Sequence, residues 1–325
     1  MTAGSLFTRA ATRFEVRAFV HALAAAGVIA MAACGGAGTA GPSVPVVDTP
    51  ASTGPIQSGK KYVGRNGYIE YFAGDAPVII TAPHGGSLTP DEIRDRTNGV
   101  TVRDSETDDL AMQIAQVYFE QTGRRAHLII NRLHRRKLDA NREIVEASNG
   151  DPHSERAWRE FHAFVDSASA LVTRNHERGL LVDIHGHGHE IQRVELGYLL
   201  TSQDLAGADA TLNTDAVIRR SSIRALAERS DLSFAELLRG PKSFGALLKT
   251  QGYAAVPSPD IKDPGSAPYF TGGYITLRHG SRDTGDVDGI QIESQYPGLR
   301  DTAANRRRYA QALVAVLRAY IDEHY

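Results

Sequence analysis

From Tyr62 to the end of the chain, short apolar runs alternate with longer stretches in which apolar residues recur every three or four positions. The longer stretches have the period of an amphipathic helix, and the short runs, rich in β-branched residues, are typical of strands. This alternation is expected where helices cover both faces of a largely parallel sheet. The pattern therefore predicts an α/β fold.

The strands are expected at residues 68–72, 78–81, 127–131, 180–184, 197–201, 253–256, 274–277 and 289–293. Long amphipathic helices are expected at residues 108–122, 154–178 and 302–323, and glycines follow the first two of them directly. Glycine commonly ends a helix because it adopts the left-handed conformation without steric cost. Residues 202–249 have a less regular pattern, with short helices at 220–229 and 234–238, and are expected to form a cap or insertion.

Residues 1–33 differ from the rest of the chain. Three arginines precede the apolar run 18–33, which ends in Met-Ala-Ala directly before Cys34. A basic segment followed by a short apolar run is typical of a signal peptide, and the alternative is a membrane-spanning helix. Cys34, the only cysteine, stands where the lipobox of bacterial lipoproteins has its lipidated cysteine. This resemblance implies cleavage before Cys34, lipidation of its sulfur and a place on the periplasmic face of a bacterial membrane; without lipidation the protein would be secreted.

Residues 34–60 are expected to form a flexible linker after the lipidated cysteine. They are rich in Gly, Pro, Ser, Thr and Ala and contain no aromatic residue. Such a composition cannot bury enough apolar surface to fold. The folded domain is therefore expected at residues 61–325, with the lipid as its only contact with the membrane. The net charge of −2 and the absence of a long basic stripe give a nucleic-acid partner no electrostatic support.

Two histidines are expected at the carboxyl ends of strands. His84 lies in Ala-Pro-His-Gly-Gly after the predicted strand 78–81, and His185 follows the strand 180–184. Open α/β sheets bind their ligands at this edge, so the two histidines can converge. With a carboxylate as third ligand they would form the open site of a catalytic zinc ion. The alternative for His84 is a surface turn. His187 and His189 are expected outside the ligand set, either as outer partners or exposed.

Carboxylates and arginines accompany these histidines. The acidic run 104–109 precedes a helix and offers Asp104, Glu106 or Asp108 as the third ligand, although acids at this place also cap helices. Asp183 could orient a ligand histidine. The arginine-rich segment 132–142 suits an anionic substrate or a developing oxyanion, or it is a solvated loop. Glu293, in an alternating strand, is a candidate general base or an exposed edge residue.

Taken in order, these segments resemble the N-formylglutamate amidohydrolase family, which is related to the zinc carboxypeptidases. The motifs are Pro83-His84-Gly85-Gly86, Asp104 ahead of a helix, Arg135 with Asp139-Ala140-Asn141-Arg142, Asp183-Ile184-His185-Gly186, Gly272-Gly273-Tyr274 and Gln291-Ile292-Glu293. The chain has glycine after His185 and Ala140 before Asn-Arg, where the family has serine and leucine.

The resemblance implies a three-layer α/β/α sandwich around a mixed, largely parallel sheet of the zinc carboxypeptidase type. It also implies one Zn²⁺ per chain, held by His84, Asp104 and His185. Glu293 would be the general base and Arg135 the oxyanion partner. The substrate-binding residues would be Asn141, Arg142 and Tyr274.

The expected function is zinc-dependent hydrolysis of an amide bond in a small molecule or peptide with a free carboxylate. An N-acyl amino acid, an N-formylglutamate-like compound, or a γ-glutamyl or cell-wall peptide would fit. The alternative is a non-catalytic envelope lipoprotein that binds metal or anionic peptides through the same fold, with His187 and His189 as a metal-capture tail of the site. The number of zinc ions per chain, and the histidines on which they depend, would distinguish the two.

Overall fold

The structure is a computed structural model that describes residues 55–325. The predicted signal peptide, Cys34 and most of the predicted linker lie outside the described residues. Within residues 55–325, no helix is both long enough and apolar enough to cross a membrane.

A mixed sheet of eight strands forms the centre of the fold, in the order β1-β2-β4-β3-β5-β8-β6-β7. The strands are β1 (Lys61–Val63), β2 (Ile69–Phe72), β3 (Val78–Ala82), β4 (His127–Asn131), β5 (Gly179–His187), β6 (Val194–Gly197), β7 (Ala255–Val256) and β8 (Val287–Gln295). The four central strands β4, β3, β5 and β8 are parallel, whereas β2 and β6 run antiparallel to their neighbours β4 and β8. The carboxyl ends of β3, β5 and β8 therefore meet at one edge.

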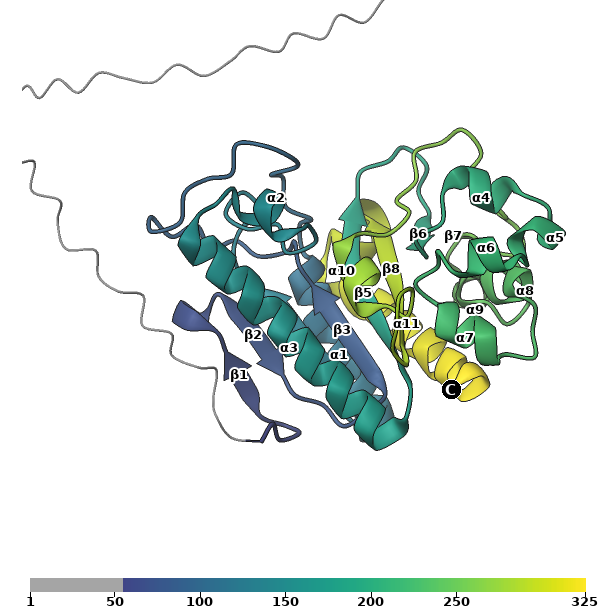
Figure 1. Ribbon diagram of the computed structural model, residues 1–325, viewed down its shortest axis with the longest axis horizontal. Coiled ribbons are helices and arrows are strands. Elements are labelled where there is room, and N and C mark those ends of the chain that lie inside the picture. The colour runs from purple at the N-terminus through teal and green to yellow at the C-terminus, as the bar shows by residue number, and fades with distance from the viewer. Residues whose placement is uncertain (1–54) are drawn as a thin grey trace, which may run out of the picture. The chain divides into compact units, whose positions relative to one another are not determined.

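Helices cover both faces of this sheet, which confirms the predicted α/β sandwich (Figure 1). The helices α1 (Thr107–Thr122) and α11 (Ala303–His324) pack on one face, and α3 (Pro152–His176) and α10 (Tyr274–His279) pack on the other. Side chains of β3 alternate between the two layers: Val78 and Ile80 belong to the core of α1 and α11, and Ile79 belongs to that of α3. Helix α3 begins at a strong cap, because Asp151 accepts hydrogen bonds from two backbone N–H groups of its first turn.

The segment between β6 and β7 forms a helical lobe, at the right of Figure 1. Its helices are α4 (Ser202–Ala206), α5 (Asp209–Leu212), α6 (Asp215–Ile218), α7 (Arg224–Arg229), α8 (Phe234–Arg239) and α9 (Phe244–Thr250). Capping boxes begin α4 and α8, and the apolar sides of the lobe join the core that contains α11. The prediction of an inserted helical region is confirmed. A further short helix, α2 (Ile144–Ser148), follows the arginine-rich segment.

Two predicted strands are wrong in type or place. Residues 274–277 form the helix α10, whose Ile275 N–H donates to Oδ1 of Asn141. The strand predicted at 197–201 lies earlier, at Val194–Gly197, and the chain then leaves the sheet through Leu199 with a φ of 63°. Both errors concern short apolar runs, whose periodicity cannot distinguish a strand from a buried helical turn.

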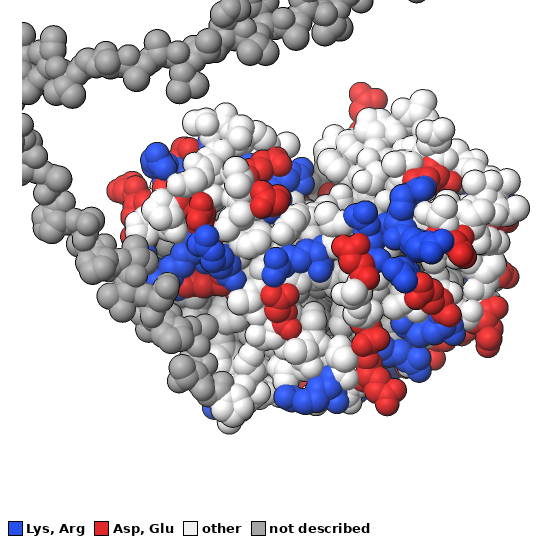
Figure 2. Space-filling view, in the orientation of Figure 1, with Lys and Arg blue, Asp and Glu red and all other residues white. Residues whose placement is uncertain are grey.

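The surface shown in Figure 2 mixes basic and acidic side chains, and it is hollowed between α2 and the lobe of α4–α9. In the same orientation β5 runs toward this hollow (Figure 1). The edge at which β3, β5 and β8 end is therefore the natural place to look for a site.

Candidate metal centre

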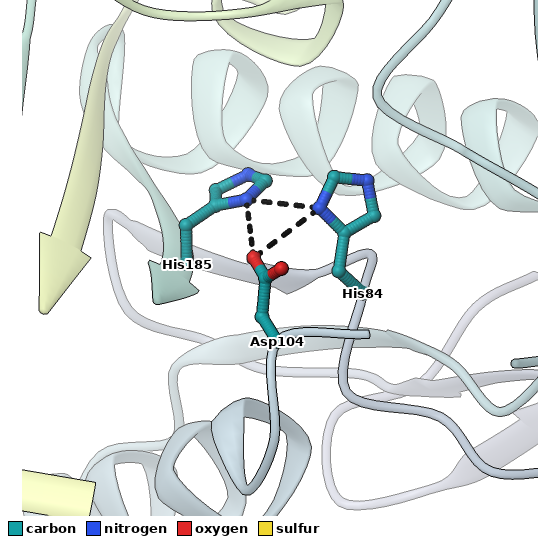
Figure 3. Close-up of side chains that lie close together, drawn as sticks. All are labelled: His84, Asp104 and His185. Atoms are coloured by element: carbon teal, nitrogen blue, oxygen red, sulfur yellow. Dashed lines mark hydrogen bonds and ion pairs between the residues drawn. The ribbon is translucent and has the colours of Figure 1, made fainter. Parts of the chain in front are cut away.

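Three side chains from separate parts of the sequence converge at this edge (Figure 3). His84 follows β3 by two residues and His185 lies near the end of the neighbouring parallel strand β5. Asp104 comes from the loop before α1 and is held there because its carbonyl accepts from Thr107 Oγ1 at 2.8 Å. The loop around His84 passes so close to α1 that a Cβ on Gly85 would lie 2.3 Å from a backbone nitrogen. Glycine is thus required sterically at this position.

The spacing of the three ligand atoms fits a zinc ion. Nδ1 of His84 lies 3.1 Å from Nδ1 of His185, and Oδ2 of Asp104 lies 3.4 Å and 3.2 Å from these two nitrogens. Four ligands placed tetrahedrally at about 2.0–2.1 Å from zinc lie about 3.3–3.4 Å from one another. The three residues are almost completely buried, and their ligand atoms form a candidate metal site.

Buried carboxylates orient both histidines from behind. Nε2 of His84 lies 2.6 Å from Asp139, and Nε2 of His185 lies 2.8 Å from Asp183. Because a carboxylate only accepts, each Nε2 carries the proton and each Nδ1 directs a lone pair at the centre. Asp183 is itself fixed by Thr81 Oγ1 at 2.7 Å. Such carboxylate–histidine pairs are the usual outer support of metal ligands.

The electrostatics of the cluster favour a positive charge at its centre. Burial raises the pKa of Asp104, but His84 and His185 outweigh burial and hold that pKa well below its usual value. Burial lowers the pKa of His185, yet the carboxylates of Asp183 and Asp104 reverse this and raise it well above 6.5. When His185 is unprotonated, Nδ1 of each histidine and Oδ2 of Asp104 are acceptors that repel one another. A cation bound between them removes this repulsion and supplies the positive charge that a proton on His185 would otherwise supply.

Only Asp104, of the three acidic candidates, reaches the histidines. Asp108 pairs with Arg132 at 3.0 Å, and Glu106 pairs with Arg306 at 3.4 Å. Glu106 has a positive φ of 68° at the start of α1, which turns the chain so that the preceding loop carries Asp104 inward. The choice among these residues thus depends on the path of the loop.

Glu293 lies beside the cluster on β8, opposite His185 in the strand register. Its Oε1 is 3.9 Å from Nδ1 of His185 and accepts from Gln291 Nε2 at 2.9 Å, whereas Oε2 has no hydrogen-bond partner. Burial, together with the nearby carboxylates, raises the pKa of Glu293 to about 8 although His185 opposes this. A buried carboxylate with a free oxygen next to a cation site is suited to proton transfer.

Arg135 and Asn141 also belong to the centre. Arg135 donates to Asp104 at 3.2 Å and to Asp139 at 2.9 Å. It therefore connects the candidate ligand Asp104 with the carboxylate that orients His84. Asn141 Nδ2 lies 3.2 Å from both His185 Nε2 and Gln291 Oε1. Asp139 is fully buried and was not singled out from the sequence, although it stands within the motif that contains Asn141.

The other two predicted substrate-binding residues lie farther out. Arg142 is partly exposed, pairs with Glu146 at 3.2 Å and donates to the carbonyl of Asn141. The ring of Tyr274 packs against Trp158 and His162 at centroid distances of 5.8 Å and 5.4 Å. Neither side chain contacts the three ligand residues in the described structure.

Arg300 is a further component that the sequence did not indicate. This buried arginine donates to the carbonyls of Ser294, Ser105 and His187, and its guanidinium occupies the space beside Gly186. A Cβ on Gly186 would lie 2.2 Å from Cζ of Arg300. The absence of a side chain at Gly186 therefore makes room for this arginine.

Comparisons with known proteins give only distant similarities. No family model and no curated protein matches the chain. N-formylglutamate amidohydrolase from Ralstonia eutropha is 11% identical, with a TM-score of 0.49 over 78% of this chain and 97% of that one. A gene product of Agrobacterium tumefaciens is 14% identical, with a TM-score of 0.44 over 79% of this chain and 95% of that one. A proposed metallopeptidase from Shewanella amazonensis is 12% identical, with a TM-score of 0.37 over 83% and 85%.

One of these proteins bears the name of the family that the sequence motifs resemble. Because every TM-score is below 0.5, neither the fold nor the chemistry of this chain rests on these similarities. Both rest on the chain's own residues.

Proposed function

We propose that the protein is a zinc-dependent hydrolase of amide bonds in substrates that carry a free carboxylate. The observation that carries the proposal is the triangle of His84, Asp104 and His185, with its two supporting carboxylates and a buried glutamate at its side. The donor set of two imidazoles and one carboxylate is that of catalytic zinc sites with an open position. Zinc bound there would polarise the scissile carbonyl and acidify a water molecule.

Glu293 would take the proton from the attacking water and return it to the leaving amine. Its Oε2 is the free oxygen, and a pKa raised to about 8 lets it accept a proton and release it near neutral pH. The hydrogen bond from Gln291 holds Oε1, so the carboxylate keeps its orientation during both steps.

Arg135 would stabilise the negative charge that develops on the carbonyl oxygen. Its Nε and Nη1 are fixed by Asp139 and Asp104, and Nη2 remains without a partner among the described residues. A donor that is fixed before the reaction costs little reorganisation when charge appears. Arg142 would bind the substrate's carboxylate at the rim, in exchange for its contact with Glu146.

An N-acyl amino acid, an N-formylglutamate-like compound and a γ-glutamyl or cell-wall peptide all present an amide bond with a carboxylate nearby. The γ-glutamyl and cell-wall peptides suit a lipoprotein on the periplasmic face of a membrane. Export with lipidation of Cys34 is part of this proposal. The apolar run before Cys34 supports it. Incorporation of a labelled fatty acid into the wild type, but not into Cys34→Ser, would test the anchor.

The activity is tested by incubating the zinc-loaded protein with N-acyl amino acids, γ-glutamyl peptides and muropeptides. Each substrate is paired with an analogue whose carboxylate is amidated. We expect release of the amine from the free acids, at least tenfold slower release from the blocked analogues, and no release by His84→Ala. Metal-loaded protein that binds these compounds but cleaves none would instead indicate the non-catalytic binding protein.

A further inference from the structure

A second group of ligand-type side chains lies farther along the same edge of the sheet. His187 is the last residue of β5, His189 follows two residues later, and Glu195 lies in β6, opposite Glu293 in the strand register. One ligand atom from each of His187, His189 and Glu195 lies within 4.8 Å of the other two. Two imidazoles and one carboxylate form the same type of donor set as the first centre.

Glu195 is a fully buried carboxylate in this group. Its Oε2 accepts from the backbone N–H of Phe270 at 2.9 Å, and its Oε1 lies 3.0 Å from Nδ1 of His189. The nearest fixed cation is Arg193, whose Nε is 3.9 Å from Oε1, too far for a hydrogen bond. A carboxylate so enclosed requires a positive partner close by.

Both histidines are held by contacts on the sides away from Glu195. Nε2 of His187 lies 2.8 Å from the carbonyl of Arg193; since a carbonyl only accepts, this nitrogen carries the proton. The lone pair of Nδ1 accepts from the backbone N–H of His189 at 3.2 Å, and a metal ion at Nδ1 would replace that hydrogen bond. The ring of His189 is stacked on Phe270, with centroids 4.8 Å apart and planes within 9° of each other. Histidines that bind metals are usually oriented by such outer contacts.

The guanidinium of Arg193 lacks the acceptors that a buried arginine requires. The residue is 5% exposed, and its Nε and Nη2 are buried without a hydrogen-bond partner. Leaving charged donors unpaired in the interior is costly, so these two donors favour the binding of an acceptor beside them. An anion could bind beside Arg193 only if a positive charge also balanced the negative charge of the Glu195 carboxylate.

We propose that His187, His189 and Glu195 form a second binding site for a divalent metal ion of the zinc type, whose fourth ligand is an anion that accepts from Arg193. A single bound metal–anion pair gives Glu195 its cation and Arg193 its acceptor. The ion must share this region with a guanidinium, so it binds more weakly than an ion at the first centre. The site does not depend on the hydrolase function, and it adds to the one zinc ion that the family resemblance implies.

The test is equilibrium dialysis of the purified full chain against buffered free zinc, with bound zinc measured per chain. Wild type is expected to bind two ions, the weaker of which is lost in Glu195→Gln and the tighter in His84→Ala. The matched control is Glu190→Gln, an exposed glutamate in the same segment, which should still bind two.

Wild type that saturates at one ion would overturn the proposal, and so would a folded Glu195→Gln that still binds two. If Glu195→Gln does not fold, as judged by circular dichroism, His189→Gln replaces it, because the His189 side chain is 19% exposed and tolerates change more easily. A wild-type protein that binds two ions but hydrolyses none of the substrates would contradict the proposed function and leave the second metal site standing. Failure of the second site and failure of the proposed function are therefore distinguishable.

Discussion

Nε2 of His84 and Oδ1 of Asp139 lie 2.6 Å apart in the interior of the protein. Asp139 is fully buried, and its second oxygen accepts from Arg135 at 2.9 Å. Burial raises the pKa of Asp139, but His84 and the nearby arginines lower it far more, so the residue is a carboxylate at every ordinary pH. It therefore fixes the tautomer of His84 and increases the electron density on the nitrogen that faces the metal centre.

Asp139→Asn is expected to weaken zinc binding at the first centre by about 10- to 100-fold, because the amide is a poorer acceptor and leaves Arg135 with Asp104 as its remaining charge partner. Competition with a chelator of known affinity, in a Glu195→Gln background, measures this constant. The control is Asp95→Asn, because Asp95 is 53% exposed and its partners, Arg136 and Lys137, contact none of the three ligand residues. Equal zinc affinities in the wild-type and Asp139→Asn centres would contradict this role.

The convergence of His84 and His185 could be predicted from the sequence. Each follows or ends a continuous apolar strand, and carboxyl ends of parallel strands meet at one edge of a sheet. Only the family resemblance pointed to Asp104; residue type could not select it, because Glu106 and Asp108 are equally acidic and the loop's path decides which one points inward. The positions of the two histidines could thus be predicted because they follow regular strands, whereas the position of Asp104 could not, because it lies in an irregular loop.

Long-range contacts also set the elements that were predicted wrongly or not assigned. Residues 274–277 are helical partly because Asn141, far away in the sequence, accepts from the first turn of α10. The role of Asp139 depends on the return of its loop to His84, and no spacing rule encodes that distance. The contribution of Arg193 and Glu195 to the group of His187 and His189 was not foreseen, since β6 was expected three residues later than it lies.

Glu293→Gln should leave the fold and zinc binding intact and lower kcat by about 100- to 10,000-fold, because the amide cannot take the proton from water. The substitution conserves shape in a fully enclosed site and retains an oxygen for Gln291. Glu190→Gln, with an exposed side chain, is the matched control. A Glu293→Gln protein with bound zinc and an unchanged rate would exclude Glu293 as the base.

Removal of zinc is expected to lower stability as well as activity, because the ion binds the three buried ligand atoms only when the folded state brings them together. A ligand present at about a thousand times its dissociation constant stabilises the folded state by about 4 kcal/mol. In a Glu195→Gln background, Tm should fall with a chelator and recover with zinc. Adding His84→Ala should abolish the zinc-dependent part of Tm; an undiminished response would place the stabilising ion elsewhere.

Acid should destabilise the protein through His127, well away from the centre. Its Nδ1 accepts from Tyr71 Oη at 2.8 Å and from the N–H of Gly74 at 3.1 Å, which requires the neutral ring. Burial lowers the pKa of His127 from 6.5 to about 4. The folded state therefore resists protonation that the unfolded chain accepts, so this contribution is complete above pH 6.5 and is lost as the pH falls toward 4.

Urea unfolding measures this effect. The wild type should lose about 2 kcal/mol through His127 between about pH 7.5 and about pH 5. His127→Gln should be less stable than wild type at the higher pH but should lose correspondingly less on acidification. Parallel pH profiles for the two proteins would show that His127 is not the group responsible.

Two neighbouring glycines give the sharpest test of packing beside the metal centre. Gly186 and Gly188 both have ordinary negative or extended φ values, so a methyl group acts on either through space alone. At Gly186 the Cβ would lie 2.2 Å from Cζ of Arg300, whereas at Gly188 it meets nothing within 4 Å. Arg300 cannot retreat freely, because it is buried and donates to three carbonyls.

Gly186→Ala is therefore expected to cost about 1–3 kcal/mol in the free energy of unfolding, the usual range for overpacking. It should also weaken zinc binding, since the N–H of Gly186 donates to Oδ2 of Asp104 at 3.2 Å. Gly188→Ala should change neither quantity beyond about 0.5 kcal/mol. Gly186→Ser, which adds a Cβ at the same place, should behave like Gly186→Ala as long as Arg300 is present. A stable Gly186→Ser protein with normal zinc affinity would show that the Arg300 side chain moves aside at little cost. The space that Arg300 occupies would then not explain the glycine at this position.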